Sequence, residues 1–131
     1  MDLKVGSNIL QKIDYKQIVQ EFTHFYYTKI TSNPMELFTI GMINDHTRFN
    51  INGTIFKHNE IYTELNNMSF GTPLIIKIDT TNSMDSGSRR IDILVNGTMT
   101  KGSITKSFSQ SFLLAYKDSW KIQNSILNIF I

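Results

Sequence analysis

The first apolar pattern in the chain is that of an amphipathic helix over residues 14–30. Asp14, with Gln17 three residues later, resembles a capping box at its start. Ser32-Asn33-Pro34 supplies the stop, because proline cannot continue a helix. The apolar residues recur at steps of three and four, which places them on one stripe of the helix: Ile18, Phe22, Phe25, Tyr26 and Ile30.

Two shorter helices and a β-hairpin are predicted next. Asn33 offers a cap before Pro34, so residues 34–40 are expected to form a second helix. Residues 59–66 carry apolar side chains at helical spacing and are expected to form a third. The β-prone runs between these helices cover residues 47–51 and 54–57 and are joined by Asn52-Gly53, which suits a two-residue hairpin turn.

After Pro73 the pattern changes to that of β-strands. Runs rich in Ile, Val, Thr and Phe predict long antiparallel strands over residues 74–80, 89–100, 104–117 and 120–131. Polar or glycine-containing segments separate them, at residues 82–88, 101–102 and 117–119. Helices followed by a meander of strands indicate an α+β fold, with the helices packed on one face of the sheet.

The strand over residues 89–100 contains Asn96-Gly97, a second candidate turn. A turn there would leave only residues 98–100 for the next strand, so we predict that the strand runs through it. Side-chain alternation then puts two sets on the core face: Ile91, Ile93, Val95 and Met99, and Phe108, Phe112, Leu114 and Tyr116. The opposite face is small and polar with occasional aliphatics, which suits either solvent or a wet protein interface.

Composition restricts the class of protein further. A chain of 131 residues is expected to form one domain over residues 1–131. With 40% hydrophobic residues it is too apolar for disorder, and it lacks an apolar run long enough to span a bilayer, so no membrane insertion is expected. A net charge of +2 is too small to indicate a surface that binds nucleic acid. The absence of cysteine excludes disulfides and thiol chemistry.

Candidate chemistry is sparse. His24, His46 and His58 have no metal-ligand spacing, so surface or structural roles are expected. Asp79 and Asp92 alternate with apolar neighbours and are the candidate general bases of a hidden acid/base site, although alternation turns Asp92 away from the core. The aromatic residues 22–27 are interpreted as core rather than as a base-stacking platform. We predict no catalytic residue, cofactor or metal.

Several segments together resemble the nuclear transport factor 2 family, in the family's order and over nearly the whole chain. The most specific are the Phe-x-Gln-x-Phe strand and the final Trp-to-Asn strand. The matching segments are residues 22–27 (FTHFYY), the hairpin followed by residues 60–65 and Phe70, and residues 91–99 (IDILVNGTM), 108–114 (FSQSFLL) and 120–124 (WKIQN). The resemblance implies a cone: three N-terminal helices packed on the concave side of a curved antiparallel sheet.

Departures from the family pattern favour one kind of member. Family members that import the GDP-bound Ran GTPase carry a pair of acids just before the Phe-x-Gln-x-Phe strand, where this chain has Lys101 and Lys106. A like charge at a complementary interface opposes binding. On this charge argument, the resemblance implies a non-enzymatic transport factor, the small subunit of a messenger-RNA export heterodimer in the nucleus, nuclear pore and cytoplasm. The last strand, at residues 124–128, lacks the family's usual acid and arginine. That departure counts against the export assignment, because the arginine commonly takes part in the pairing.

Three alternatives remain open from the resemblance: a homodimeric carrier importing Ran-GDP, a scaffold-type domain binding Phe-Gly peptides, and a cone-fold dehydratase or isomerase. The implied partner is a second nuclear transport factor 2-like domain, in a homodimer or heterodimer. Phe-Gly nucleoporins and Ran-GDP are further candidates, and no direct nucleic acid is expected. By resemblance and by alternation, the dimer interface is predicted at Leu94, Asn96, Ser109, Ser111, Leu113, Asn124, Ile126 and Asn128.

Overall fold

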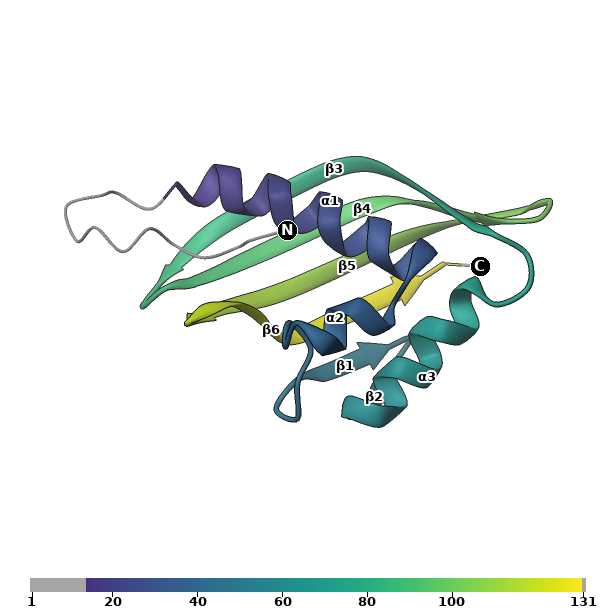
Figure 1. Cartoon of the computed structure of the whole chain (residues 1–131). Helices are drawn as coiled ribbons and strands as arrows, with labels where there is room; N and C mark the ends of the chain where they lie inside the picture. The colour runs from purple at the N-terminus through teal and green to yellow at the C-terminus, as the bar shows by residue number, and fades with distance from the viewer. Residues whose placement is uncertain (1–13, 131) are drawn as a thin grey trace.

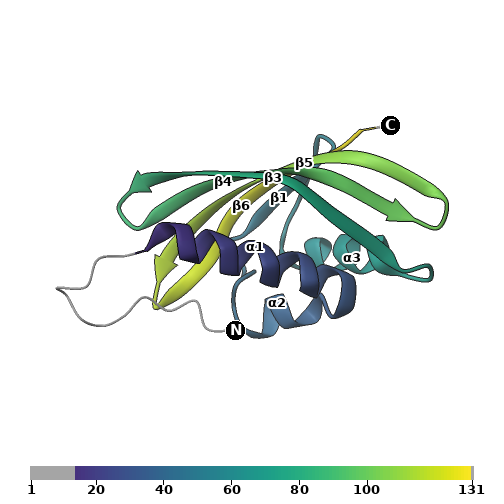
Figure 2. The same ribbon diagram turned by 90° about the horizontal axis from the view of Figure 1, so that it is seen from above.

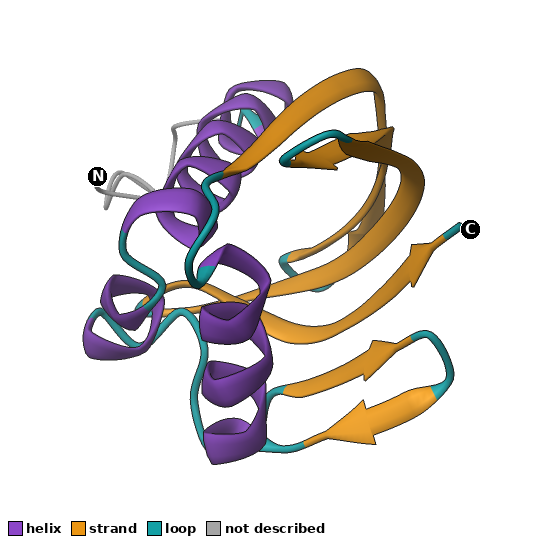
Figure 3. Cartoon of the chain, turned by 90° about the vertical axis from the view of Figure 1, so that its right-hand side faces the viewer, coloured by secondary structure: helices purple, strands orange, loops and turns teal. Residues whose placement is uncertain are grey.

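The computed structural model describes residues 14–130, which form a curved six-stranded sheet with three helices on one side (Figure 1, Figure 2). The strand order is β2-β1-β6-β5-β4-β3, and all neighbours are antiparallel except the parallel pair β1–β6. The sheet curves around the side that the helices occupy (Figure 3). The elements are α1 (Tyr15–Ser32), α2 (Met35–Thr39), β1 (Arg48–Ile51), β2 (Thr54–Phe56), α3 (His58–Ser69), β3 (Leu74–Gly87), β4 (Arg90–Lys101), β5 (Ile104–Lys117) and β6 (Ser119–Ile129). The predicted α+β cone is confirmed, with one parallel strand pair.

The long first helix begins where its cap predicts. The side chain of Asp14 accepts a hydrogen bond from the backbone N–H of Gln17 at 3.1 Å. The reciprocal half of a capping box is absent at this cap, because the Gln17 side chain donates instead to Glu21. Asp14 therefore acts as a simple N-cap that satisfies one of the free N–H groups of the first turn.

The short helices differ from prediction only at their ends. Pro34 is the N-cap of α2 rather than its first helical residue. Helix α3 extends past the predicted residues 59–66 at both ends, and the backbone N–H of Lys57 donates to the side chain of Glu60 at its start. Within the described residues, none of the helices is both long and apolar enough to cross a membrane.

Strand β3 is the element whose bounds differ most from the prediction. The chain does not leave the sheet after Thr80 but stays paired with β4 as far as Gly87. The connection shrinks to Ser88 and Arg89, which both have positive φ. Residues 79–87 are exposed, so burial imposes no hydrophobic alternation on them. Pairing with β4 makes this segment a strand, and a polar sequence carries no sign of that pairing.

Strand β4 runs through Asn96-Gly97, as predicted, and the glycine serves packing rather than a turn. A Cβ atom on Gly97 would lie 2.1 Å from the backbone oxygen of Lys77 on β3. The β3–β4 register shifts beside it, between Ile78 and Thr80. Glycine inside a strand therefore marks a close backbone approach here. The other candidate turn, Asn52-Gly53, does form the predicted hairpin, with positive φ at both residues.

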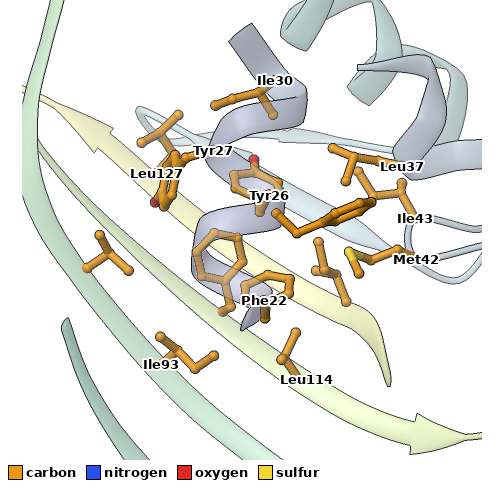
Figure 4. Close-up of a cluster of buried hydrophobic side chains, with 14 of the residues drawn as sticks. Phe22, Tyr26, Tyr27, Ile30, Leu37, Met42, Ile43, Ile93, Leu114 and Leu127 are labelled. Carbon is orange, nitrogen blue, oxygen red and sulfur yellow. The ribbon is translucent and has the colours of Figure 1, made fainter. Parts of the chain in front are cut away.

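The core lies between α1 and the concave face of the sheet (Figure 4). The ring of Phe112 packs edge-on against Phe22 and Tyr26, with centroids 4.9 and 4.8 Å apart. The aromatic residues of α1 are therefore core, which confirms that interpretation over a base-stacking platform. Of the predicted core-face side chains on β4 and β5, only Tyr116 is not fully buried; the buried ones are Ile91, Ile93, Val95, Met99, Phe108, Phe112 and Leu114.

Candidate functional site

The eight residues predicted as an interface lie together on one face of β4, β5 and β6. Residues paired across neighbouring strands point to the same side of a sheet. The pairing joins Leu94 to Ser111 and Ser111 to Ile126 in one row. Parallel rows hold Asn96–Ser109–Asn128 and Leu113–Asn124. The intervening residues of each strand are buried against the helices, so the eight face away from them. We call this side the outer face.

The outer face has an apolar centre within a polar surround. Leu94 and Ile126 are 42% and 46% exposed, and Leu113 is half-buried. Serine and asparagine occupy the remaining five positions, so none of the eight is charged. A hollow of about 380 Å³ lies over β3, β4 and β5 beside Leu94 and Leu113. These eight residues, with their exposed aliphatic centre, can exclude water against a complementary surface without burying a charge of their own.

Neighbouring strands extend the outer face beyond the predicted residues. On β3, Asn82 pairs with Leu94, and Met84, which is 66% exposed, pairs with Asp92. On the other side, Asn50 of β1 pairs with Ile126, and Ile55 of β2, also 66% exposed, pairs with Asn50. Sequence reasoning missed these positions. Residues 82–88 were expected to be a loop, and no local signal reveals the parallel pairing of β1 with β6.

A buried polar network supports the outer face from beneath. The Oε1 atom of Gln110 accepts from the Tyr27 hydroxyl at 2.8 Å, and its Nε2 donates to the oxygens of Tyr26 and Ser125 at 3.2 and 3.0 Å. The Ser125 hydroxyl in turn donates to the backbone oxygen of Ser111 at 2.7 Å. Gln110 is the middle residue of the Phe-x-Gln-x-Phe strand, so this motif serves the core.

Burial raises the pKa of both tyrosines above its ordinary value. At Tyr26, burial raises the pKa, and this effect is larger than the lowering of the pKa by the hydrogen bond with Gln110. For Tyr27, the nearby Tyr26 adds to the effect of burial on the pKa. Both phenols therefore stay neutral at physiological pH, and the Tyr27 hydroxyl remains the donor to Gln110.

An open cavity of about 650 Å³ lies between α1 and β3 on the concave side. Val19, Ile76 and Ile78 contribute apolar surface to it, and the titratable side chains in its lining are His24 and Tyr27. Neither candidate general base lies there. Asp79 is exposed on β3, outside this lining. Asp92 lies on the outer face, where its carboxylate accepts a hydrogen bond from Ser86.

The histidines do not converge on a metal site. His24 and His46 are exposed, and the Nδ1 atom of His58 lies 3.5 Å from a carboxylate oxygen of the exposed Asp45. Across residues 14–130, no three His, Cys, Asp or Glu side chains are grouped as metal ligands.

Lys101 and Lys106 lie at one end of the concave side. Lys101 pairs with the buried Leu74, and Lys106 pairs with the buried Met99, so both share the face of the core residues. The Nζ atom of Lys101 donates to the backbone oxygen of Asn67 in the last turn of α3, at 3.4 Å. The positive charges are thus on the opposite side of the sheet from the predicted interface.

Comparison with solved structures finds the same fold in proteins of low sequence identity. Nuclear transport factor 2 from Cryptosporidium parvum has a TM-score of 0.76 and 20% identity, over 88% of this chain and 94% of that one. A chain of the yeast deubiquitinase Ubp3 and Bre5 cofactor complex has a TM-score of 0.76 and 18% identity, over 91% and 99%. A chain of the C. albicans Mtr2-Mex67 M domain complex has a TM-score of 0.68 and 11% identity, over 89% and 95%.

Comparison at the level of sequence gives a match to one family. No curated protein matches the chain significantly. A family model for the nuclear transport factor 2 (NTF2) domain matches residues 18–129, from the first helix to the end of β6. That match includes both segments on which the resemblance chiefly rested. The chain belongs to the nuclear transport factor 2 domain family.

Proposed function

We propose that this protein is a non-enzymatic nucleocytoplasmic transport factor that pairs through its outer face with a second NTF2-like domain. More specifically, we propose the small subunit of a messenger-RNA export heterodimer, acting in the nucleus, the nuclear pore and the cytoplasm. The observation that carries the proposal is the patch of eight uncharged residues on the outer face of β4, β5 and β6, with Leu94 and Ile126 exposed at its centre.

The composition of this face suits a protein partner of the same architecture. Two sheets can pack face to face about 10 Å apart and interdigitate their side chains. Leu94, Leu113 and Ile126 would supply the apolar centre of such a contact, and the asparagines and serines around them its hydrogen-bonding rim. The C. albicans structure with a similar fold is itself a complex, of Mtr2 with the Mex67 M domain.

Charge favours export pairing over Ran import. Lys101 and Lys106 lie on the concave side, at the end of β4 and the start of β5. By the family resemblance, acids at these places face Ran. Lysines there would set like charges against a basic partner surface, which lowers both affinity and association rate.

The concave cavity gives the non-enzymatic part of the proposal its support. A dehydratase or isomerase needs a carboxylate or histidine held in a water-excluding pocket against its substrate. The lining of the α1–β3 cavity includes no carboxylate, and its histidine, His24, is exposed. Much of the remaining concave side is filled by core side chains, including Phe22, Tyr26 and Phe112.

The test is capture of the partner from the native cell with tagged protein, followed by identification of the captured proteins by mass spectrometry. We expect an export receptor that contains its own NTF2-like domain. The Ile126→Glu variant should no longer capture that receptor, because the substitution places an unpaired charge in the buried centre of the contact. Ile40→Glu is the matched control: Ile40 follows α2 on the helical side and is 46% exposed, as is Ile126.

Three results would contradict the proposal. Retention of Ran-GDP in place of a receptor would restore the import alternative. Capture of a deubiquitinase would assign the chain to the cofactor class represented by Bre5. Equal loss of the receptor in Ile126→Glu and Ile40→Glu would show that the contact does not involve the outer face.

A further inference from the structure

A second apolar surface lies at the opposite side of the sheet, where α3 ends and β3 begins. It is a hollow of about 330 Å³ whose floor includes Met68, Leu74, Met99, Ile104 and Ile129. The end of α3, the β4–β5 hairpin and the end of β6 meet around it, at the right-hand end of Figure 1. Ile104 is 61% exposed, so part of this floor is left open to water. We call it the mouth hollow.

Two lysines are the charged side chains that line the mouth hollow. Lys101 and Lys106 both project to the concave side, and no aspartate or glutamate is among the lining residues. Lys101 donates to a backbone oxygen of α3, and neither lysine takes part in an ion pair among residues 14–130. The hollow therefore combines an apolar floor with positive charge that no neighbouring carboxylate neutralises.

We propose that the mouth hollow binds an acidic segment of another protein, which inserts one apolar side chain between Lys101 and Lys106. The floor removes that side chain from water, and carboxylates on either side of it face the two ammonium groups. The volume lies near the lower end of the range for small-molecule sites, which suits one anchor rather than a long buried segment. Two lysines on an apolar floor do not make the basic track that a nucleic-acid backbone requires.

This site is independent of pairing through the outer face. The mouth hollow opens on the concave side, and the outer-face residues point the other way. A protein that has bound its NTF2-like partner would still have the hollow free. The Ile126→Glu variant should therefore bind the acidic segment as the wild type does, whether or not pairing occurs.

Binding can be measured by fluorescence anisotropy with labelled synthetic peptides. The probe is Gly-Asp-Glu-Leu-Glu-Asp-Gly; one comparison peptide has serine at the centre, and a second has asparagine and glutamine in place of the acids. We expect both comparison peptides to bind at least about tenfold more weakly, since anchor and charge each contribute. Lys101→Glu with Lys106→Glu should weaken binding of the probe by at least about tenfold. Lys117→Glu with Lys121→Glu changes the net charge equally at the other end of β5 and should leave it unchanged.

The methionines locate the site within the same protein. In protein whose methionine methyl groups are labelled with ¹³C, addition of the probe should shift the resonances of Met68 and Met99. The resonance of Met84, on the outer face, should not shift. Absence of binding at about millimolar probe would overturn the proposal. The proposal would also be overturned if the serine peptide bound as tightly as the probe, or if the Lys117/Lys121 control lost as much affinity as the Lys101/Lys106 variant. Shifts at Met84 instead of Met68 and Met99 would overturn it as well.

Discussion

The concave and outer faces of β4, β5 and β6 are built from alternate residues of the same segments, yet they have opposite physical properties. Ile93, Phe112 and Leu127 lie on the concave face and are buried beneath the helices. Their sequence neighbours Leu94, Ser111 and Ile126 form a row on the outer face and are exposed or half-buried. A difference of one position therefore separates residues that hold the fold from residues available to a partner.

The largest expected difference is between Phe112 and its neighbour Ser111. Phe112→Ala removes a ring that contacts Phe22 and Tyr26, and should lower the free energy of unfolding by about 3–5 kcal/mol. Ser111→Ala, on the outer face, should change the free energy of unfolding by less than about 0.5 kcal/mol. Ser111 accepts the hydrogen bond from Ser125 through its backbone oxygen, which the substitution keeps. Urea unfolding followed by circular dichroism measures both. Similar losses for the two variants would mean that the faces are assigned incorrectly.

The next effect concerns pairing rather than folding. Ile126→Glu should weaken association with the partner domain by at least about 2 kcal/mol, which is roughly 30-fold in affinity. Its unfolding midpoint should stay close to that of the wild type, because Ile126 contacts solvent in the described chain. Sedimentation velocity of the purified assembly measures the first quantity. An unchanged sedimentation coefficient would remove Ile126 from the interface.

A smaller effect is expected from the buried network. Gln110→Leu keeps the volume but leaves the Tyr27 hydroxyl without its acceptor and Ser125 without a donor. Unpaired buried polar groups of this kind cost about 1–3 kcal/mol. Ser109→Ala, one residue away on the outer face, is the control and should be nearly neutral. Wild-type stability of Gln110→Leu in thermal unfolding would mean that the network makes no net contribution to stability.

Much of this arrangement follows from local signals in the sequence. Alternation assigned the faces of β4 and β5, Asp14 marked the start of α1, and Asn52-Gly53 marked the hairpin. Residues 82–87 gave no such signal, because a strand exposed on both sides needs no hydrophobic period. The parallel pairing of β1 with β6 joins residues 48–51 to residues 124–127, so no short window contains it. Alternation correctly placed the eight predicted residues on one shared face, but it could not reveal that Met84 and Ile55 lie on the same side of the neighbouring strands.

A last pair of measurements tests whether charge separates the two sides of the sheet in function. Under the export proposal, unmodified protein should bind Ran-GDP negligibly at physiological salt, because Lys101 and Lys106 would then face a surface of like charge. Lys101→Asp with Lys106→Asp should partly restore binding, since each close complementary pair can contribute about 1.5 kcal/mol or more. The same double variant should lose the acidic peptide at the mouth hollow, so the two affinities should change in opposite directions while pairing through the outer face stays constant. Calorimetry measures both affinities. Micromolar binding of Ran-GDP to the unmodified protein would overturn the export proposal, because the lysines would then not exclude the import partner.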